Sequence, residues 1–329
     1  MNQHRRAFAR LLLTTAALAA TTGMACAQTA AAWPTKPVRV VVPYAPGGSS
    51  DTLGRVIAKH LSDVFKQTFV VENRGGAGGI IGSQLVARAE PDGYTLVVSG
   101  IGSHVVAPVD NPNAYDPIKD FTHIAILGGP PAVLAVNATL PIKDLAGFIA
   151  YAKSRPEGLS WGSPGQGTHA ALIGEAFRAE TGLNLVQISY KGANPAVADV
   201  AANQVPAAFT TLTTAAGNIR SGRLRAIAVT SSKRIAEFPD VPTFAELGYP
   251  RLVGTTWFSL SGPAGMNPAL VDKLNAEVRR GLKTPAAVQE LATQNMETFD
   301  WDVPTFNQYV KKEIDHWTPY VKEAAVAKK

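Results

Sequence analysis

The sequence predicts an α/β protein made of two lobes. From about residue 38, short apolar runs rich in valine and isoleucine alternate with amphipathic helical runs, which is typical of α/β folds with mainly parallel sheets. A second, self-contained series of the same kind begins near residue 130. The chain has 329 residues, enough for two domains that each bury a core of their own.

The first series contains strands at 38–45, 67–73 and 94–100, and each strand ends in a loop of small residues. After the first loop, apolar residues recur at helical spacing between Leu53 and Phe65, which predicts a helix. The glycine-rich turn at 74–79 opens a second helix. In open α/β sheets a ligand crevice lies at the carboxyl ends of the strands, so we expect these loops to share one edge of a sheet.

The second series alternates strictly and leads into a turn-rich connector at 231–255. Its predicted strands are 132–137, 159–163, 184–190, 205–211 and 224–231, and its predicted helices are 145–155, 168–180, 196–203 and 215–222. The connector leads to a strand at 256–262 and to amphipathic helices at 268–283, 285–295 and 303–324.

These elements predict a discontinuous first lobe, 28–129 plus 252–329, and an inserted second lobe, 130–251. The chain then crosses twice between the lobes. Lobes joined in this way can hinge, and the cleft between them can close on a small ligand.

The first 27 residues are typical of a secretory signal peptide. Arg5, Arg6 and Arg10 precede an apolar run, and Ala25-Cys26-Ala27 supplies a small-residue cleavage site. The run is too short, and too interrupted by threonine, for a membrane span. We expect cleavage after Ala27 and a periplasmic mature protein. The arginine pair also resembles a twin-arginine signal, so both export routes stay open.

Charge and cysteine content narrow the range of partners. The chain has 31 basic and 25 acidic side chains, and removing the three arginines of the signal lowers the net charge from +6 to +3. That value is too small for a nucleic-acid footprint, so no nucleic-acid partner is predicted. The one cysteine, Cys26, leaves with the signal, which excludes disulfides and thiolate metal sites from the mature chain. We expect a monomer.

The stretch PYAPGGSSD, residues 43–51, joins the first strand to the first helix. Gly47 and Gly48 let the backbone turn and approach a ligand, and Ser49, Ser50 or Asp51 can cap the helix. The N–H groups of the first turn can then face an anion. A capped turn without a ligand has the same pattern. No Gly-Lys-Ser/Thr follows, so the stretch is not a nucleotide-binding P-loop.

A second loop of this kind, residues 163–168, precedes the helix predicted at 168–180. Thr168 can cap that helix, and its glycines do not have the G-x-G-x-x-G spacing of a dinucleotide site. Two helix N-termini, one from each lobe, can hold a carboxylate between uncharged donors. His169 directly follows this loop and can either hydrogen-bond a ligand or cap its own helix.

No motif for catalysis is found. The six histidines have no metal-ligand spacing, Ser163 lacks the G-x-S-x-G context, and no acidic pair stands out. We therefore predict no enzymatic activity, no cofactor and no metal. An exported hydrolase that uses the same cleft is kept as an alternative.

Several stretches in order resemble one family. They are VVVPYAPGGSSD, VVENRGGAGGIIGS, PDGYTLVVSG, YDPIKDFTHIAILG, YKGANPAVADV, LRAIAVTSSKR, FPDVPTFAELGYP and TWFSLSGPAG. From about Trp33 to its C-terminus the chain is similar to the Bug family, the periplasmic receptors of tripartite tricarboxylate transporters. The resemblance implies a type II periplasmic binding fold and capture of a small carboxylate for a membrane permease. An orphan receptor that signals to a membrane sensor is the alternative within the family.

The resemblance also implies which residues bind. The ligand's carboxylate is expected to contact backbone groups and waters at two facing loops. In this sequence the implied residues are Tyr44, Ala45, Gly47, Gly48, Ser49, Asp51, Ser99, Gly100, Thr168, His169, Tyr190, Lys191 and Gly192. We add Phe209 and Thr210, from the strand at 205–211, as further candidates for ligand contact.

The strand at 205–211 departs from the family's pattern. The family commonly has Val-Asp and a second polar or acidic residue here, and this chain reads VPAAFTT, without an acid. A receptor for an acidic amino acid needs a carboxylate opposite the ammonium group. We therefore expect a carboxylic acid without an amine, such as an aromatic acid that packs on Tyr44 or Phe209.

Overall fold

The computed structural model describes residues 33–165 and 167–326. The predicted signal peptide, its cleavage site after Ala27 and Cys26 lie outside these residues. The description below concerns the compact unit that begins at residue 37. In the described part of the chain, no helix is long and apolar enough to cross a membrane.

The first of the two described sheets has the strand order β2-β1-β3-β10-β4. Strand β1 pairs in parallel with β2 on one side and with β3 on the other, and β10 runs antiparallel between β3 and β4. The strands are β1 (Val38–Val42), β2 (Phe69–Asn73), β3 (Thr95–Gly100), β4 (Phe121–Gly128) and β10 (Phe258–Pro263). We call this sheet and the helices that cover it lobe 1.

The second sheet has the order β7-β6-β8-β5-β9. The strands are β5 (Ala132–Asn137), β6 (Leu159–Ser163), β7 (Leu185–Ser189), β8 (Ala207–Thr211) and β9 (Leu224–Val229). Strand β6 is parallel to β7 and β8, and β5 is antiparallel to β8 and β9. We call this sheet and its helices lobe 2.

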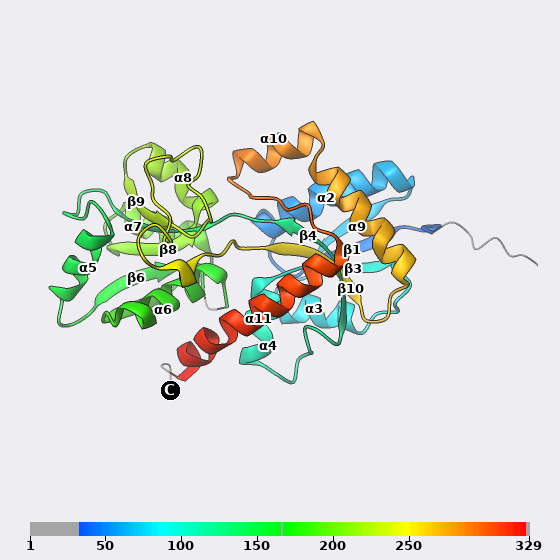
Figure 1. Ribbon diagram of the computed structural model, residues 1–329, viewed down its shortest axis with the longest axis horizontal. Helices are drawn as coiled ribbons and strands as arrows, with labels where there is room; N and C mark the ends of the chain where they lie inside the picture. The colour runs from blue at the N-terminus through cyan, green and yellow to red at the C-terminus, as the bar shows by residue number, and fades with distance from the viewer. Residues whose placement is uncertain (1–32, 166, 327–329) are drawn as a thin grey trace, which may run out of the picture. The chain divides into compact units, whose positions relative to one another are not determined.

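Helices cover both faces of the first sheet because its strands alternate their buried side chains. Val42 and Val98 point toward Gly54 of α2, and Val41 and Val97 belong to an apolar cluster with Val86 of α3. The helices of lobe 1 are α2 (Ser49–Phe65), α3 (Ile80–Ala87), α4 (Ala107–Asp110), α9 (Pro268–Leu282), α10 (Pro285–Thr293) and α11 (Val303–Val326), with short turns η1 (Ala77–Gly79) and η2 (Gly102–Val106) (Figure 1).

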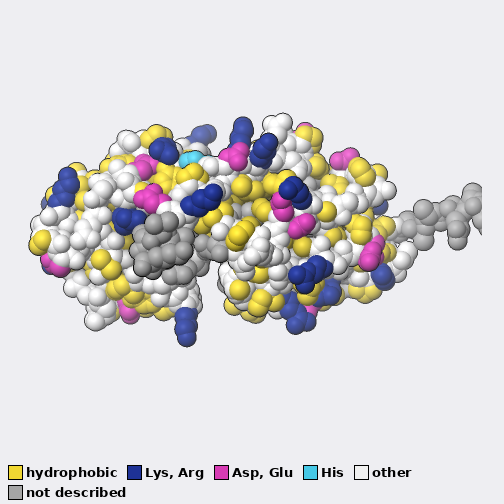
Figure 2. Space-filling model, turned by 90° about the horizontal axis from the view of Figure 1, so that it is seen from below, with side chains coloured by type: hydrophobic (Ala, Val, Ile, Leu, Met, Phe, Trp, Pro, Cys, Tyr) yellow, Lys and Arg dark blue, Asp and Glu magenta, His cyan; other side chains and the backbone are white. Residues whose placement is uncertain are grey.

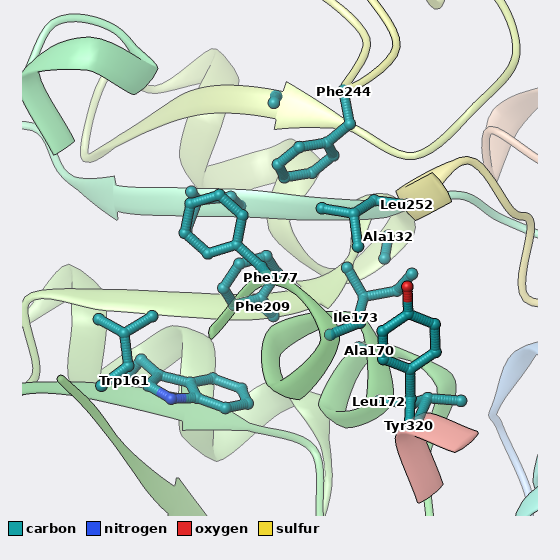
Figure 3. Close-up of a cluster of buried hydrophobic side chains, with 14 of the residues drawn as sticks. Ala132, Trp161, Ala170, Leu172, Ile173, Phe177, Phe209, Phe244, Leu252 and Tyr320 are labelled. Atoms are coloured by element: carbon teal, nitrogen blue, oxygen red, sulfur yellow. The ribbon is translucent and has the colours of Figure 1, made fainter. Parts of the chain in front are cut away.

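Lobe 2 is covered by α5 (Leu145–Lys153), α6 (His169–Thr181), α7 (Ala193–Ala201) and α8 (Leu212–Arg220), and the connector contains a short turn, η3 (Pro250–Leu252). Its core is aromatic: Phe209 packs edge-on against Trp161 at 5.3 Å and stacks on Phe244 at 6.3 Å (Figure 3). Figure 3 also shows Tyr320, from α11, beside Ile173 of α6.

Helix α11 therefore packs against both lobes. It lies against β4 of lobe 1, and its end reaches α6 of lobe 2. There the Tyr320 hydroxyl donates a hydrogen bond to Glu180 at 2.9 Å. On the face shown in Figure 2, basic and acidic side chains are interspersed with apolar ones over both lobes.

The chain crosses between the sheets at 129–131 and again at 253–257, and the two crossings are bonded to each other. The Thr256 N–H donates to the Pro130 carbonyl at 3.0 Å, and Pro131 forms a bridge with Thr255. A Cβ on Gly129 would lie 1.7 Å from the Thr256 oxygen, so this close approach requires glycine.

In each of the two described sheets four of the five strands point the same way, as expected of mainly parallel sheets, and one strand is reversed. The strands that follow the crossings, β5 and β10, run against both of their neighbours, so each sheet is mixed. Strand β4 was not among the predicted strands. The predicted lobe boundaries stay a prediction.

Candidate functional site

A cavity of about 390 Å³ lies where helices α2, α6, α7 and α8 begin. Loops from both lobes form its wall, together with the end of the second crossing. The lining residues are 44–50, 101–102, 164, 167–170, 192–194, 211, 214, 256 and 258. Because helix N-termini carry partial positive charge and unsatisfied N–H groups, their convergence on one cavity favours an anion.

The loop before α2 is shaped by Asp51, which does not line the cavity. Gly48 is the N-cap, so the predicted side-chain cap from Ser49, Ser50 or Asp51 is wrong. Instead the Asp51 carboxylate accepts hydrogen bonds at 3.0 Å from the Gly47 N–H, from Arg55 and from Asn73. Burial acts to raise the pKa of Asp51, but these hydrogen bonds together hold it below its ordinary value.

Asp51 thereby leaves the start of α2 available to a ligand. Gly47 has φ +83°, a conformation that favours glycine, and the turn directs Ser49 and Ser50 to the cavity wall. The N–H groups of Ser49 and Ser50 find no acceptor among the described residues. The negative charge of Asp51 is turned away and neutralised by Arg55.

Helix α6 presents a capped N-terminus from lobe 2. Thr168 is the N-cap, as predicted: its hydroxyl accepts from the Ala171 N–H at 3.3 Å and donates to the Gly165 carbonyl at 2.8 Å. The N–H groups of His169 and Ala170 have no acceptor in the described part of the chain. Both residues line the cavity.

His169 is held as a neutral ring. Its Nδ1 lies 2.9 Å from the Thr256 hydroxyl, and its ring packs edge-on against Trp317 at 5.5 Å. Burial, assisted by His316, lowers the pKa of His169 to about 3. The side chain therefore adds no positive charge to the cavity at neutral pH.

Helices α7 and α8 complete the wall on the lobe 2 side. Gly192, with φ +131°, is the N-cap of α7 and brings Ala193 and Asn194 to the cavity. Thr211 is the N-cap of α8, and its hydroxyl lies 3.0 Å from that of Thr214. The cavity wall on this side therefore presents backbone N–H groups, the side-chain amide of Asn194 and the hydroxyls of Thr211 and Thr214.

Aromatic side chains supply the apolar part of the wall. Tyr44 and Phe258 contact each other edge-on, with ring centroids 6.4 Å apart. Burial, partly offset by hydrogen bonding to Ser103, raises the pKa of Tyr44 to about 12, so its hydroxyl stays neutral. No Asp, Glu, Lys or Arg occurs among the described lining residues.

The structure brings part of the predicted set together at this cavity. Tyr44, Ala45, Gly47, Gly48, Ser49, Thr168, His169 and Gly192 line it. The structure places Asp51, Ser99, Gly100, Tyr190, Lys191, Phe209 and Thr210 outside the described lining. Contact of any of these residues with a ligand stays a prediction.

Packing around the first sheet explains why Ser99 and Gly100 do not line the cavity. The Ser99 hydroxyl is buried within the first sheet, 2.7 Å from that of Ser259 and 2.9 Å from that of Ser261. Gly100 is covered by the second crossing, because a Cβ there would lie 2.6 Å from the Trp257 oxygen.

The lobe 2 residues outside the cavity have structural partners. Phe209 is fully buried among Trp161, Phe177 and Phe244, so the expectation that it packs on a ligand is not supported (Figure 3). Thr210 is fully buried as well. The Tyr190 hydroxyl donates to Asp199 at 2.7 Å.

Sequence reasoning missed lining residues on both lobes, among them Ile101, Gly102, Asn194, Thr211, Thr214, Thr256 and Phe258. Thr211 is the last residue of β8, and the rule that ligands bind at the carboxyl ends of strands, applied to the second sheet, identifies it. Thr256 reaches the cavity from a crossing and Phe258 from the first position of β10, and no sequence pattern places either residue there.

Comparison with known proteins decides the family. The family described as "Tripartite tricarboxylate transporter family receptor" matches residues 53–326. The chain belongs to this family. It is 35% identical to Protein BugT of Bordetella pertussis over 316 residues, which cover 95% of this chain and 97% of BugT. The resemblance inferred from the sequence is confirmed.

Solved structures agree with the family assignment. A structure described as a periplasmic transporter is 39% identical, with a TM-score of 0.80 over 89% of this chain and 98% of that one. R. palustris Rpa4515 with adipate is 33% identical, with a TM-score of 0.80 over 89% and 98%. MatC from Rhodopseudomonas palustris with bound malate is 31% identical, with a TM-score of 0.78 over 88% and 100%. The tripartite tricarboxylate receptor therefore has the predicted type II periplasmic binding fold, with two α/β lobes. Its relatives are binding proteins rather than enzymes.

Proposed function

We propose that this receptor captures a small di- or tricarboxylate or an aromatic acid, without an amine, by closing its lobes in the periplasm. It releases the acid, chemically unchanged, to the membrane permease of a tripartite tricarboxylate transporter. The observation that carries the proposal is the convergence of the N-termini of α2, α6, α7 and α8 on a cavity without charged lining residues in its described part.

Support for a carboxylate comes from the donors on the two lobes. Ser49 and Ser50 offer N–H groups from lobe 1, and His169 and Ala170 offer them from lobe 2. A carboxylate has two oxygens with acceptor sites for such donors, and the helix dipoles add to the attraction. Structural neighbours with adipate and malate support the same ligand class.

Support for an acid without an amine comes from the missing negative charge. An ammonium group in a closed cavity requires a carboxylate or several acceptors close to it. The described lining contains no acid, and the carboxylate of Asp51 is already bonded to Arg55 and Asn73. Tyr44 and Phe258 offer apolar surface to a hydrocarbon chain or an aromatic ring.

The test is the melting temperature of residues 28–329 with a panel of acids. Succinate and aspartate, and glutarate and glutamate, form matched pairs that differ only by the amine. Adipate, malate, citrate, benzoate, terephthalate and nicotinate complete the panel. A ligand present at about 100 times its dissociation constant adds about 2.7 kcal/mol, which raises the melting temperature by several degrees.

We expect a shift with at least one acid that lacks an amine, and none with its amino counterpart. Equal shifts with both members of a pair contradict the amine rule and leave the receptor role intact. No shift with any acid, for protein that has been unfolded and refolded to remove bound ligand, contradicts the carboxylate proposal. Cleavage by water of an ester or amide of a bound acid during incubation supports the hydrolase alternative.

A further inference from the structure

Gly102 lies where the two lobes touch inside the cavity. It begins the π-helical turn η2, one residue after Ile101 and two after the end of β3, and it is buried. The backbone of Gly167, in the loop before α6 of lobe 2, lies opposite it. Both glycines line the cavity.

A side chain at position 102 would crowd neighbours in both lobes in this arrangement. A Cβ built on Gly102 would lie 2.7 Å from the Tyr44 hydroxyl and 3.0 Å from the Gly167 carbonyl oxygen. Both distances are shorter than ordinary van der Waals contacts. The first conflict is within lobe 1, and the second is between the lobes.

The requirement for glycine at position 102 is one of space and not of backbone conformation. The φ of Gly102 is outside the left-handed region, so alanine fits the local backbone. Gly47 and Gly192, which also line the cavity, have positive φ and open space where a Cβ would stand. A Cβ on Gly167 would meet Val106 of η2 at 3.9 Å, an ordinary contact that places the same turn at this junction.

We propose that Gly102 is the position that lets the lobes close, and that a side chain there holds the cleft open. The proposal rests on the proposed function, in which closure accompanies capture of a carboxylate. It assigns Gly102 a positioning role: the residue acts through the approach of lobe 2 and donates no side-chain group to the ligand.

The variants separate the two conflicts. Gly102→Ala and the bulkier Gly102→Val introduce both. Tyr44→Phe removes the hydroxyl from lobe 1, so the double variant Tyr44→Phe/Gly102→Ala retains only the conflict with the Gly167 carbonyl. Gly217→Ala is the matched control, because it lies in α8 with ordinary φ and nothing within 4 Å of a new Cβ.

Lobe closure is measured by the distance between two spin labels. Residues 28–329 contain no cysteine, so Lys59→Cys on α2 and Lys153→Cys on α5 provide unique exposed attachment points in lobes 1 and 2. The distance distribution is recorded with and without adipate, or with the panel acid that gives the largest melting shift. Affinity for the same acid is measured by calorimetry.

We expect adipate to shift the label distance in the wild type and in Gly217→Ala, and to shift it less in Gly102→Ala and least in Gly102→Val. The dissociation constant rises by at least about tenfold in Gly102→Ala, the usual cost of an added methyl in a tight contact. The double variant stays at least about tenfold weaker than Tyr44→Phe. Circular dichroism confirms that each variant is folded.

The proposal is overturned if Gly102→Val closes and binds like the wild type, or if Tyr44→Phe restores closure to Gly102→Ala. If the wild type binds no acid of the panel, the proposed ligand class is wrong. The ligand-free distributions then decide the closure role. The wild type must contain a closed-lobe population that Gly102→Val lacks, and identical distributions overturn the proposal.

Discussion

The Nδ1 atom of His169 lies 2.9 Å from the Oγ1 atom of Thr256, and this contact joins the start of α6 to the second crossing. Both side chains are buried and both residues line the cavity. The contact therefore fixes one wall of the cavity to the segment that connects the lobes.

Replacing Thr256 by valine tests this contact. The change keeps the shape of the side chain and removes the hydroxyl, which leaves His169 buried with neither ring nitrogen bonded to a described residue. We expect a loss of about 1–3 kcal/mol in stability and weaker ligand binding. Thr256→Ser keeps the hydroxyl and should behave like the wild type. Equal behaviour of the two variants contradicts this role, and urea unfolding with calorimetry measures both effects.

The N–H of Ser49 is expected to act as a ligand donor. Ser49 is the first residue of α2, where proline fits a helix, and Gly48 has φ −86° and ψ 172°, which a following proline tolerates. Ser49→Pro removes the N–H with the helix intact, and Ser49→Ala removes only the side chain. We expect the proline variant to lose about tenfold in affinity, close to one charge-assisted hydrogen bond. This role is refuted if calorimetry shows that Ser49→Ala weakens ligand binding more than Ser49→Pro does.

Stability is expected to fall as the pH decreases from 6.5 toward 4. Burial lowers the pKa of His104, of His123 to about 4, and of His169 to about 3. Below pH 6.5 these histidines bind protons in the unfolded chain, whereas in the folded chain they stay neutral. Acidification therefore favours the unfolded chain and lowers the free energy of unfolding. Each of these groups changes the free energy of unfolding by up to about 1.4 kcal/mol per pH unit.

Melting curves at pH 7.5, 6.0 and 5.0 measure this effect above the range in which Asp51, whose pKa is lowered, titrates. Replacing His123 by asparagine should reduce the slope of melting temperature against pH. A melting temperature that is constant or rises between pH 7.5 and 5.0 contradicts the prediction.

Ser99 is expected to affect stability and not binding. Its hydroxyl bonds to those of Ser259 and Ser261 inside the first sheet. Ser99→Ala leaves these buried partners incompletely bonded, at a cost of about 1–3 kcal/mol. Ligand affinity should stay within about twofold. A large loss of affinity without a loss of stability would indicate that Ser99 contacts the ligand. The variant Ser259→Ala is the control, because it changes the same hydrogen-bond network.

Local patterns predicted the elements that depend on local forces. Thr168 was expected to cap the helix after β6 because its hydroxyl can accept an N–H of the first turn, and it does so. The sequence predicts helices between β1, β2 and β3, and strands connected through helices usually run parallel. The structure has this arrangement, with the loops of the three strands at one edge of the sheet.

Features set by the approach of the lobes could not be predicted in this way. The direction of β5 and β10 depends on where the chain crosses, which no local pattern records. Phe209 and Thr211 are close in sequence, but packing against Phe177 and Phe244 buries the first, and the start of α8 brings the second to the cavity. The sequence alone does not distinguish Gly102 from other small residues. Its constraint comes from Gly167 of the other lobe, which lies opposite it in the structure.

The two crossings are hydrogen-bonded to each other at Pro130 and Thr256, and only glycine fits at position 129 between them. They therefore form a single hydrogen-bonded ribbon that joins the lobes. Under the proposed function, a membrane permease that touches both lobes would sense occupancy as the distance between them, without contacting the ligand itself.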